Sequence, residues 1–273
     1  MNTPKAQALT HRLANLAKQQ GVQYQFTFTT FLIQQLLLRL AKDEVLSRYL
    51  TFKGGFIMLR LYHSPRYTID LDASISGILL DQIAPLVTQV AEKEEDDGTW
   101  YRFEKAIDLE AQGEYGGLRF VFRGGIGEVI NPLSKARIIN LDLGIGNAAN
   151  GVLSEVPLLL SDESCCCNVY PEELIVAEKL HSLTTRSIGN SRSKDIFDIS
   201  HLAGKLSLEK LQRALKDTFG VRGDALPKDL FDHFQSMDTS VLRRGWNSAV
   251  ASVADSKSFD DSWEDILALI KRI

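Results

Sequence analysis

The chain has 273 residues, of which 44% are hydrophobic and 24% are charged, and its formal net charge is −4. This hydrophobic content excludes an intrinsically disordered chain, and the length suits one large domain or two closely packed ones. The acidic balance does not indicate a nucleic-acid binder, which usually has a basic excess, although a local basic patch is compatible with it.

The beginning of the chain carries no signal for export. Residues 1–13 lack the apolar stretch of a secretory signal. The most apolar segment, residues 26–40, is interrupted by two glutamines and one arginine, whereas a transmembrane helix needs ~20 mostly apolar residues. We therefore expect a cytoplasmic protein without a membrane span.

The first part of the chain alternates between helical and extended patterns. In chain order, we expect helices at 4–18, 29–42, 56–62 and 81–95, and strands at 51–53, 67–75, 100–109, 117–123, 136–145 and 156–160. Three adjacent cysteines at 165–167 lack the spacing of a disulfide framework or a zinc site. They indicate free thiols on a surface strand or loop of a protein in a reducing compartment.

The second part of the chain is almost entirely helical in pattern. We expect helices at 171–186, 193–203, 208–219 and 261–271. Pro171 suits the start of the first of these helices, and Ser193 is a natural N-cap for the second. The sequence therefore predicts an α+β fold with a core at 1–165, followed by a helical domain at 166–273.

Two carboxylates alternate along the strand expected at 67–75. Because alternate side chains of a strand share a face, Asp70 and Asp72 point the same way, with Ile69, Leu71 and Ala73 on the other side. Two carboxylates about 7 Å apart can share a hard cation with oxygen ligands. The alternative is an exposed strand face on which water screens both charges.

A third carboxylate, Asp142, lies in the alternating strand expected at 136–145. If this strand pairs with the first, Asp142 joins Asp70 and Asp72, and three carboxylates are an arrangement that holds Mg²⁺ against a nucleoside triphosphate. Otherwise Asp142 is a surface residue or the partner of a turn.

The segment Lys53-Gly54-Gly55 precedes the carboxylate strand. Two glycines allow the backbone to approach a ligand closely, and the free N–H groups of the helix that they open favour a phosphate. A tight strand-to-helix turn needs the same residues. The Gly-Lys-Ser/Thr sequence of a Walker loop is missing.

A second group of candidate residues lies in the helical part. Lys179 has the apolar residues Ile175 and Leu183 one turn away on either side, so it either extends its charge into water or contacts a triphosphate. Asp195 falls in the first turn of its helix, where it stabilises the helix dipole or orients Lys179. Nearby basic residues suit a polyanionic substrate or form a solvated charged face; they are Arg186, Arg192 and Lys194.

Together these motifs resemble the AbiEii/AbiGii toxin family of nucleotidyltransferases, to which the MenT toxins belong. The resemblance covers residues 45 to 205, and the motifs occur in the family's order. They are Lys53-Gly54-Gly55, Arg66-x-Thr68-x-Asp70-x-Asp72, Glu178-Lys179 and Arg192-x-Lys194-Asp195-x-x-Asp198.

The resemblance implies a fold and an activity. The fold is a polymerase β-like nucleotidyltransferase core with a mixed sheet, followed by a helical domain that completes the active site. The activity is NTP-dependent transfer of a nucleotide, in some relatives to the 3′ end of tRNA, by the toxin of a toxin–antitoxin or abortive-infection system. An antitoxin encoded nearby is the implied partner.

The resemblance also implies roles for individual residues. Asp70 and Asp72 would bind Mg²⁺, and Asp142, Lys179 and Asp195 would complete the catalytic set. The residues implied in nucleotide binding are Lys53, Gly54, Gly55, Arg66 and Lys179.

The mechanism that we expect is in-line attack of an acceptor hydroxyl on the α-phosphate of an NTP, with Mg²⁺ between the triphosphate and the Asp70/Asp72 pair. Asp142 helps to deprotonate the hydroxyl, and Arg66 braces the carboxylates or a phosphate. One alternative is a non-catalytic module of the same fold that binds a nucleotide or a partner. Another is a sugar-nucleotide glycosyltransferase, which leaves the glycine pair and the Lys179 region unexplained.

Overall fold

The computed structural model describes residues 3–109, 116–145, 151–185 and 192–273. The chain divides into two compact units. Unit 1 comprises Met1–His63 and Tyr67–Val169, and unit 2 comprises Ser64–Arg66 and Tyr170–Ile273. The residue at which we expected a domain boundary, 165, lies inside a strand of unit 1, and the main division between the units follows Val169.

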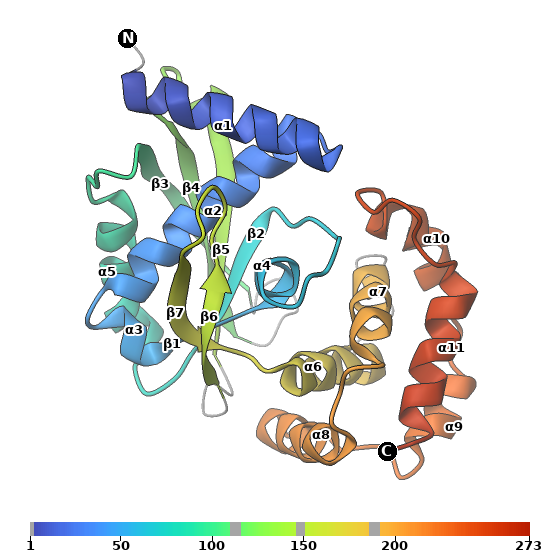
Figure 1. Ribbon diagram of the computed structural model, residues 1–273. Coiled ribbons are helices and arrows are strands. Elements are labelled where there is room, and N and C mark those ends of the chain that lie inside the picture. Colours follow the sequence, from blue (N-terminus) through green and yellow to red (C-terminus); the bar gives the residue numbers. More distant parts are fainter. Residues whose placement is uncertain (1–2, 110–115, 146–150, 186–191) are drawn as a thin grey trace. The chain divides into compact units, whose positions relative to one another are not determined.

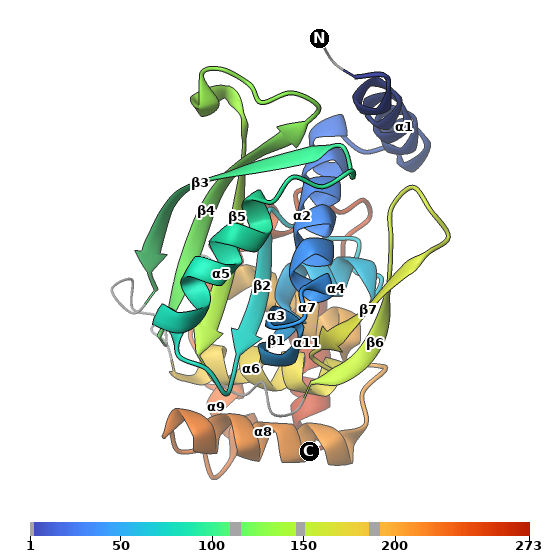
Figure 2. The same cartoon turned by 90° about the vertical axis from the view of Figure 1, so that its left-hand side faces the viewer.

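A seven-stranded mixed sheet forms the centre of unit 1 (Figures 1 and 2). Its order is β3–β4–β5–β2–β1–β7–β6, and the pairs β2–β5 and β1–β7 are parallel. The strands are β1 Leu50–Lys53, β2 Asp70–Ile75, β3 Thr99–Asp108, β4 Gly117–Ile126, β5 Arg137–Ile145, β6 Val152–Pro157 and β7 Ser164–Val169. This mixed sheet with helices confirms the predicted α+β class.

The helices of unit 1 lie before the first strand and between the first three strands along the chain. They are α1 Pro4–Gln20, α2 Tyr24–Lys42, α3 Leu46–Tyr49, α4 Gly54–Arg60 and α5 Leu80–Glu92. Helices α2 and α5 run along one face of the sheet (Figure 1). Every second residue of the central strands faces them and is fully buried, for example Leu71 on β2 and Leu141 on β5. This face therefore holds the core, and the opposite face is left for polar side chains.

Helix α2 begins five residues earlier than we predicted. Its first turns contain threonines and aromatic residues, which lower helix propensity. The hydroxyl groups of Thr29 and Thr30 donate hydrogen bonds to the backbone carbonyls of Gln25 and Phe26, which lie four residues back. Burial of this helix against the core outweighs the weak local preference.

The cysteines lie on a strand, as expected, but the expectation of a surface position is wrong for two of them. Strand β7 lies between β1 and β6 in the sheet, so it is an internal strand. Cys165 and Cys167 are buried and Cys166 is exposed. Alternation along a strand with one buried face produces this pattern.

Unit 2 is helical. Its helices are α6 Glu172–Thr185, α7 Ser193–Leu202, α8 Leu208–Arg222, α9 Leu230–Gln235, α10 Ser240–Ala249 and α11 Phe259–Ile270. Aromatic side chains fill its interior; the rings of Trp246 and Phe259 meet edge to face with 5.6 Å between centroids. Among the described helices of both units, none combines the length and the hydropathy that crossing a lipid bilayer requires.

Ser193 does not cap helix α7, contrary to our expectation. It is the first residue of the helix, and Arg192 occupies the N-cap position. The buried Ser193 hydroxyl instead donates a hydrogen bond of 2.7 Å to the backbone carbonyl of Leu242. A long-range contact has replaced the local one that the sequence suggests.

Candidate active site

The parallel pairing of β2 and β5 brings the three expected carboxylates to one face of the sheet. Asp72 lies opposite Asp142 in the register, and Asp70 lies opposite Asn140. Leu71 between the two aspartates is fully buried, which places the aspartates on the polar face. The two strands therefore pair, which was the condition for Asp142 to join Asp70 and Asp72.

Ile69 departs from the predicted alternation. It precedes β2 rather than belonging to it, and 51% of its surface is exposed. It lines a surface cavity together with Asn140 instead of joining Leu71 in the core.

Asp70 is oriented by its neighbour on β5. The amide nitrogen Nδ2 of Asn140 donates a hydrogen bond of 2.8 Å to Oδ1 of Asp70. This bond fixes the orientation of the Asp70 carboxylate relative to β5. We did not single out Asn140 from the sequence, because its role depends on the β2–β5 register.

Asp142 is held by an arginine that the sequence analysis also missed. Arg119 on β4 lies opposite Asp142 in the β4–β5 register. Its Nε and Nη2 donate hydrogen bonds of 2.7 and 2.6 Å to the two carboxylate oxygens. Such a two-point pair fixes the plane of the carboxylate and balances its charge. In the sequence, the one sign of this role is the place of Arg119 within the strand expected at 117–123.

The glycine turn lies directly against Asp72. Gly54 has φ of +69°, which L side chains rarely adopt, and a Cβ atom at this position would stand 2.0 Å from Oδ2 of Asp72. A Cβ atom on Gly55 would stand 2.8 Å from the hydroxyl of Thr68. Lys53, immediately before the turn, lies opposite Asp72 in the β1–β2 register. Both glycines are therefore needed for the turn to approach the carboxylate strand.

Two of the three carboxylates fit a divalent cation of the Mg²⁺ type. Mg²⁺ is usually held by one or two carboxylates, several waters and the phosphates of a substrate. Asp70 and Asp72 offer two carboxylates on one face, while both oxygens of Asp142 are bound by Arg119. Among the described residues, no group of three or more His, Cys, Asp or Glu side chains is suited to hold a metal alone. The site therefore suits a cation that arrives with a nucleotide.

A second cluster of charges lies within unit 2. Nζ of Lys179 is 2.6 Å from Oδ1 of Asp195 and 2.8 Å from Oδ2 of Asp198. Arg66 donates two hydrogen bonds, of 3.0 and 2.8 Å, to Asp198, and Arg192 lies 3.1 Å from Asp195. The Lys179 side chain is only 15% exposed, so it does not extend into water. The expected neighbour Arg186 lies outside the described residues.

The charges of this cluster stabilise one another. Burial alone would lower the pKa of Lys179, but the negative charges of Asp195 and Asp198 outweigh burial and raise this pKa to about 12. Burial alone would raise the pKa of Asp198, but Lys179 and Arg66 lower it to about 2. Lys179 is therefore a permanent cation near neutral pH and is unsuited to accept a proton.

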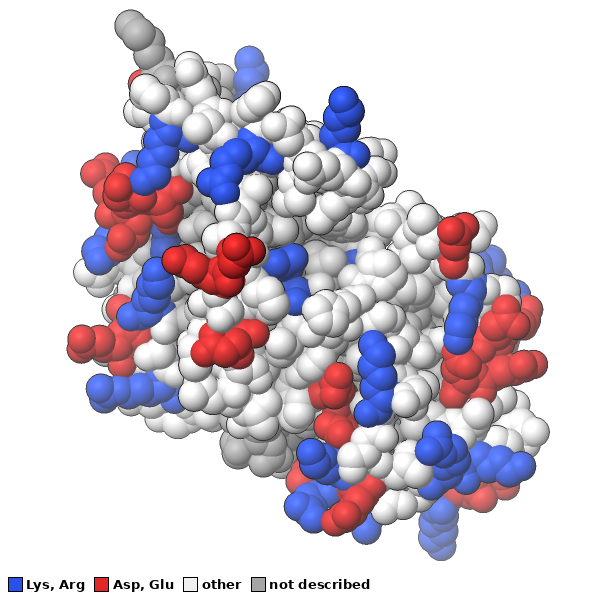
Figure 3. Space-filling view, viewed as in Figure 1, with Lys and Arg blue, Asp and Glu red and all other residues white. Residues whose placement is uncertain are grey.

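Charges of both signs are mixed on the surface that Figure 3 shows. Lys and Arg side chains stand between Asp and Glu side chains rather than in one continuous patch. This distribution agrees with the net charge of −4. On this face, no single-sign field extends over the surface.

Comparisons with known proteins identify one family and several solved structures to which this chain is similar. A family model described as "Nucleotidyl transferase AbiEii toxin, Type IV TA system" matches residues 35–268. Among solved structures, MenT4, a nucleotidyltransferase toxin from Mycobacterium tuberculosis H37Rv, has a TM-score of 0.57 at 16% identity, covering 90% of this chain and 94% of its own. JHP933 from Helicobacter pylori has a TM-score of 0.47 at 12% identity, covering 88% of each chain. No curated protein matches. The likeness to MenT4 shows a shared fold.

Proposed function

Because this chain belongs to the AbiEii family of nucleotidyltransferase toxins of type IV toxin–antitoxin systems, we propose that it transfers a nucleoside monophosphate from an NTP to a hydroxyl group of RNA. The 3′ end of tRNA is the first acceptor to test. The observation that supports this proposal most is the β2–β5 register, which aligns Asp70 and Asp72 with Asp142 beside the Gly54 turn. Mg²⁺ is the proposed cofactor.

In this proposal, the substrates bind to named groups of unit 1. The backbone of Gly54 and Gly55 and the ammonium group of Lys53 contact the triphosphate. Asp70, oriented by Asn140, and Asp72 would hold Mg²⁺, and the bound ion would offset the negative charge that develops on the reacting phosphate.

The acceptor hydroxyl then loses its proton to Asp142. Its oxygen forms a bond to the α-phosphorus, the bond from that phosphorus to the pyrophosphate breaks, and pyrophosphate leaves. Arg119 occupies one lone pair on each oxygen of Asp142, so a second lone pair on either oxygen can take the proton while the pair with Arg119 persists. We assign Arg119 as the residue that positions Asp142.

The charge cluster of unit 2 is proposed to serve the same reaction. Lys179 remains protonated, so it acts as a fixed positive charge for phosphate oxygens rather than as a base. Asp195 orients its ammonium group, and Arg66 and Asp198 hold that arrangement.

A labelled-nucleotide assay tests the proposal. The full-length protein is incubated with total RNA, Mg²⁺ and each α-³²P-labelled NTP in turn. We expect one or few NTPs to label an RNA size class, and EDTA to abolish labelling. Thermal stabilisation by an NTP without labelled product would instead favour a non-catalytic binding module. Labelling of none of the RNA species would contradict RNA as the acceptor.

The antitoxin that the family implies offers a separate test. We propose that it is encoded next to this chain. Expression of this chain alone should arrest growth, and co-expression with the neighbouring reading frame should restore it.

A further inference from the structure

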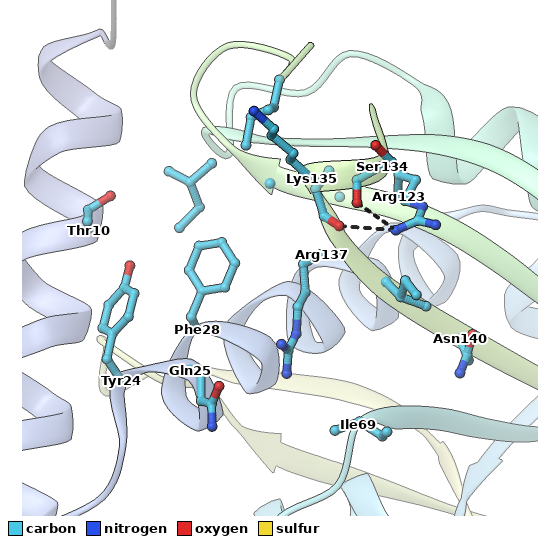
Figure 4. Close-up of a pocket in the computed structure, with 16 residues that line it drawn as sticks. Thr10, Tyr24, Gln25, Phe28, Ile69, Arg123, Ser134, Lys135, Arg137 and Asn140 are labelled. Carbon is cyan, nitrogen blue, oxygen red and sulfur yellow. Dashed lines mark hydrogen bonds between the residues drawn. The ribbon is translucent and has the colours of Figure 1, made fainter. Parts of the chain in front are cut away.

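A cavity of about 850 Å³ opens in unit 1 where β5 begins (Figure 4). Thr10 on α1 and Tyr24 and Phe28 on α2 line one side, and the end of β4 and the start of β5 line the other. The volume lies within the range of sites that bind small molecules. Of the residues that line it, the mechanism proposed above uses Asn140 alone.

Two cations at the cavity, Lys135 and Arg137, differ from the other arginine that lines it. Within the part of the chain that the structure describes, neither Lys135 nor Arg137 forms an ion pair or a side-chain hydrogen bond. Arg137 is half-buried, and Figure 4 shows its side chain extending into the cavity. Arg123 differs, because its guanidinium group is paired with Glu104. A half-buried guanidinium group without a carboxylate favours an anionic ligand such as phosphate.

Aromatic and aliphatic side chains complete the lining. The rings of Tyr24 and Phe28 lie one helical turn apart with 5.7 Å between centroids, and Tyr24 is 38% exposed. Ile138, which also lines the cavity, is 45% exposed. Exposed rings beside cations are typical of surfaces that bind single-stranded nucleic acid, because bases stack on the rings and phosphates contact the cations.

The cavity continues into the carboxylate face. Ile138, Asn140 and Asp142 alternate along β5 on the face opposite the buried Ile139 and Leu141. Asn140 both lines the cavity and donates its hydrogen bond to Asp70. A ligand in the cavity therefore lies next to the carboxylates.

The sheet order decides which substrate fits this position. The Gly54 turn follows β1, which neighbours β2 on one side, whereas the cavity adjoins β5, which neighbours β2 on the other. Attacking and leaving oxygens stand roughly in line across the reacting phosphorus. If the triphosphate lies at the glycine turn, the attacking hydroxyl must come from the side of β5.

We propose that the cavity binds the last nucleotides of a single-stranded RNA acceptor and directs its terminal hydroxyl to the carboxylate face. Arg137 and Lys135 contact its phosphates, and Tyr24 and Phe28 stack on its bases. This inference rests on the proposed function, since it assumes that the triphosphate lies at the glycine turn.

Three variants of the full chain test the inference. Arg137→Glu reverses the charge in the cavity, and Tyr24→Ala removes a stacking surface. Lys93→Glu is the matched control, because Lys93 is 68% exposed just after α5 and is not one of the residues that line the cavity. Binding of a fluorescein-labelled single-stranded RNA is measured by anisotropy without NTP. Binding of non-hydrolysable α,β-methylene NTP analogues is measured separately by calorimetry.

We expect each of the two variants to weaken RNA binding about tenfold or more. Arg137→Glu loses a phosphate contact and Tyr24→Ala loses a stacked base, and a loss of this size is typical of one such contact. Affinity for the NTP analogues should stay within about twofold of the wild type. Lys93→Glu should change neither affinity. A 4-thiouridine at the 3′ terminus of the RNA should cross-link to the α2 peptide that contains Tyr24 and Phe28.

Other outcomes overturn the inference. Unchanged RNA affinity in both variants, no binding of RNA by the wild type, or cross-links only outside the cavity would each do so. Weakened NTP binding with unchanged RNA binding would assign the cavity to the base of the NTP. If the variants lose RNA binding but the wild type transfers no nucleotide, the proposed function fails and the RNA site stands.

Discussion

Individual side chains of unit 1 are arranged by their neighbours on adjacent strands. Asn140 directs one oxygen of Asp70, and Arg119 holds both oxygens of Asp142. Asp72 instead lies against the backbone of Gly54. Each carboxylate thus has a different environment, which suits different roles for the three in one reaction.

Asp70→Ala should reduce nucleotide transfer about a thousandfold or more, because the loss of a metal ligand removes several kcal/mol of transition-state stabilisation. The fold should persist, since Asp70 lies on the polar face of β2 rather than among the buried core residues. Transfer to RNA and the melting temperature are measured together. Asp162→Ala, at an exposed loop position, is the control. Full activity of Asp70→Ala would refute the assignment.

Gly54→Ala should destabilise the protein by about 2 kcal/mol or more and abolish transfer, because positive φ strains alanine and the new methyl group collides with Asp72. Gly21→Ala separates the two effects. Gly21 has φ of +66° but nothing within 4 Å, so it should cost only about 1 kcal/mol and preserve activity. Urea denaturation and the transfer assay measure both quantities. Equal costs for both variants would show that the contact with Asp72 is unimportant.

At the scale of elements, register and ion pairs fix which segments work together. Parallel pairing of β2 with β5 aligns their polar faces, and a shift of one residue would turn Asp142 into the core. In unit 2, the Lys179 cluster joins α6, α7 and the segment 64–66. A buried network of this kind is costly to break, since removal of one charge leaves the remaining buried charges out of balance.

Asp198→Asn should lower the free energy of unfolding by about 3–5 kcal/mol at neutral pH, because it leaves the buried charges of Arg66 and Lys179 short of a partner. The pKa of Asp198 is lowered from 3.8 to about 2 in the folded state. Its contribution is therefore complete above pH 4 and is lost as the pH falls through 2.

The measurement is the difference in unfolding free energy between wild type and Asp198→Asn from pH 7 to pH 2. The difference should be constant at first and shrink below pH 4. Asp260→Asn, which breaks an exposed pair with Arg243, is the control and should show little effect. A difference between wild type and Asp198→Asn that does not depend on pH would contradict the ionised state of Asp198.

At the scale of the whole chain, the net charge of −4 leaves little general attraction for RNA. Affinity should then depend on the two cavity cations Lys135 and Arg137. The logarithm of the binding constant should fall with the logarithm of salt concentration with a slope of about −1.4, at about −0.7 per phosphate contact on a single strand.

Arg137→Ala should halve that slope to about −0.7, because one of the two phosphate contacts is lost. Anisotropy titrations of the labelled RNA at several salt concentrations give both slopes. A much steeper slope in the wild type, or the same slope in both proteins, would mean that cations elsewhere bind the RNA.

The sequence by itself determined most elements and the identity of the main candidate residues. Alternation placed Asp70 and Asp72 on one face, and the glycine pair marked the turn before them. The motif order indicated the nucleotidyltransferase family, which the family match confirms. These signals are local, because the periods of helices and strands appear within a few residues of sequence.

Only the tertiary structure decided how distant residues meet. Arg119 and Asp142 are 23 residues apart, and Arg66 and Asp198 are 132 apart. Burial of the threonine-rich start of α2, the internal position of Cys165 and the contact of Ser193 with Leu242 also depend on packing. Strand register and burial are properties of the assembled core, and no short stretch of sequence encodes them.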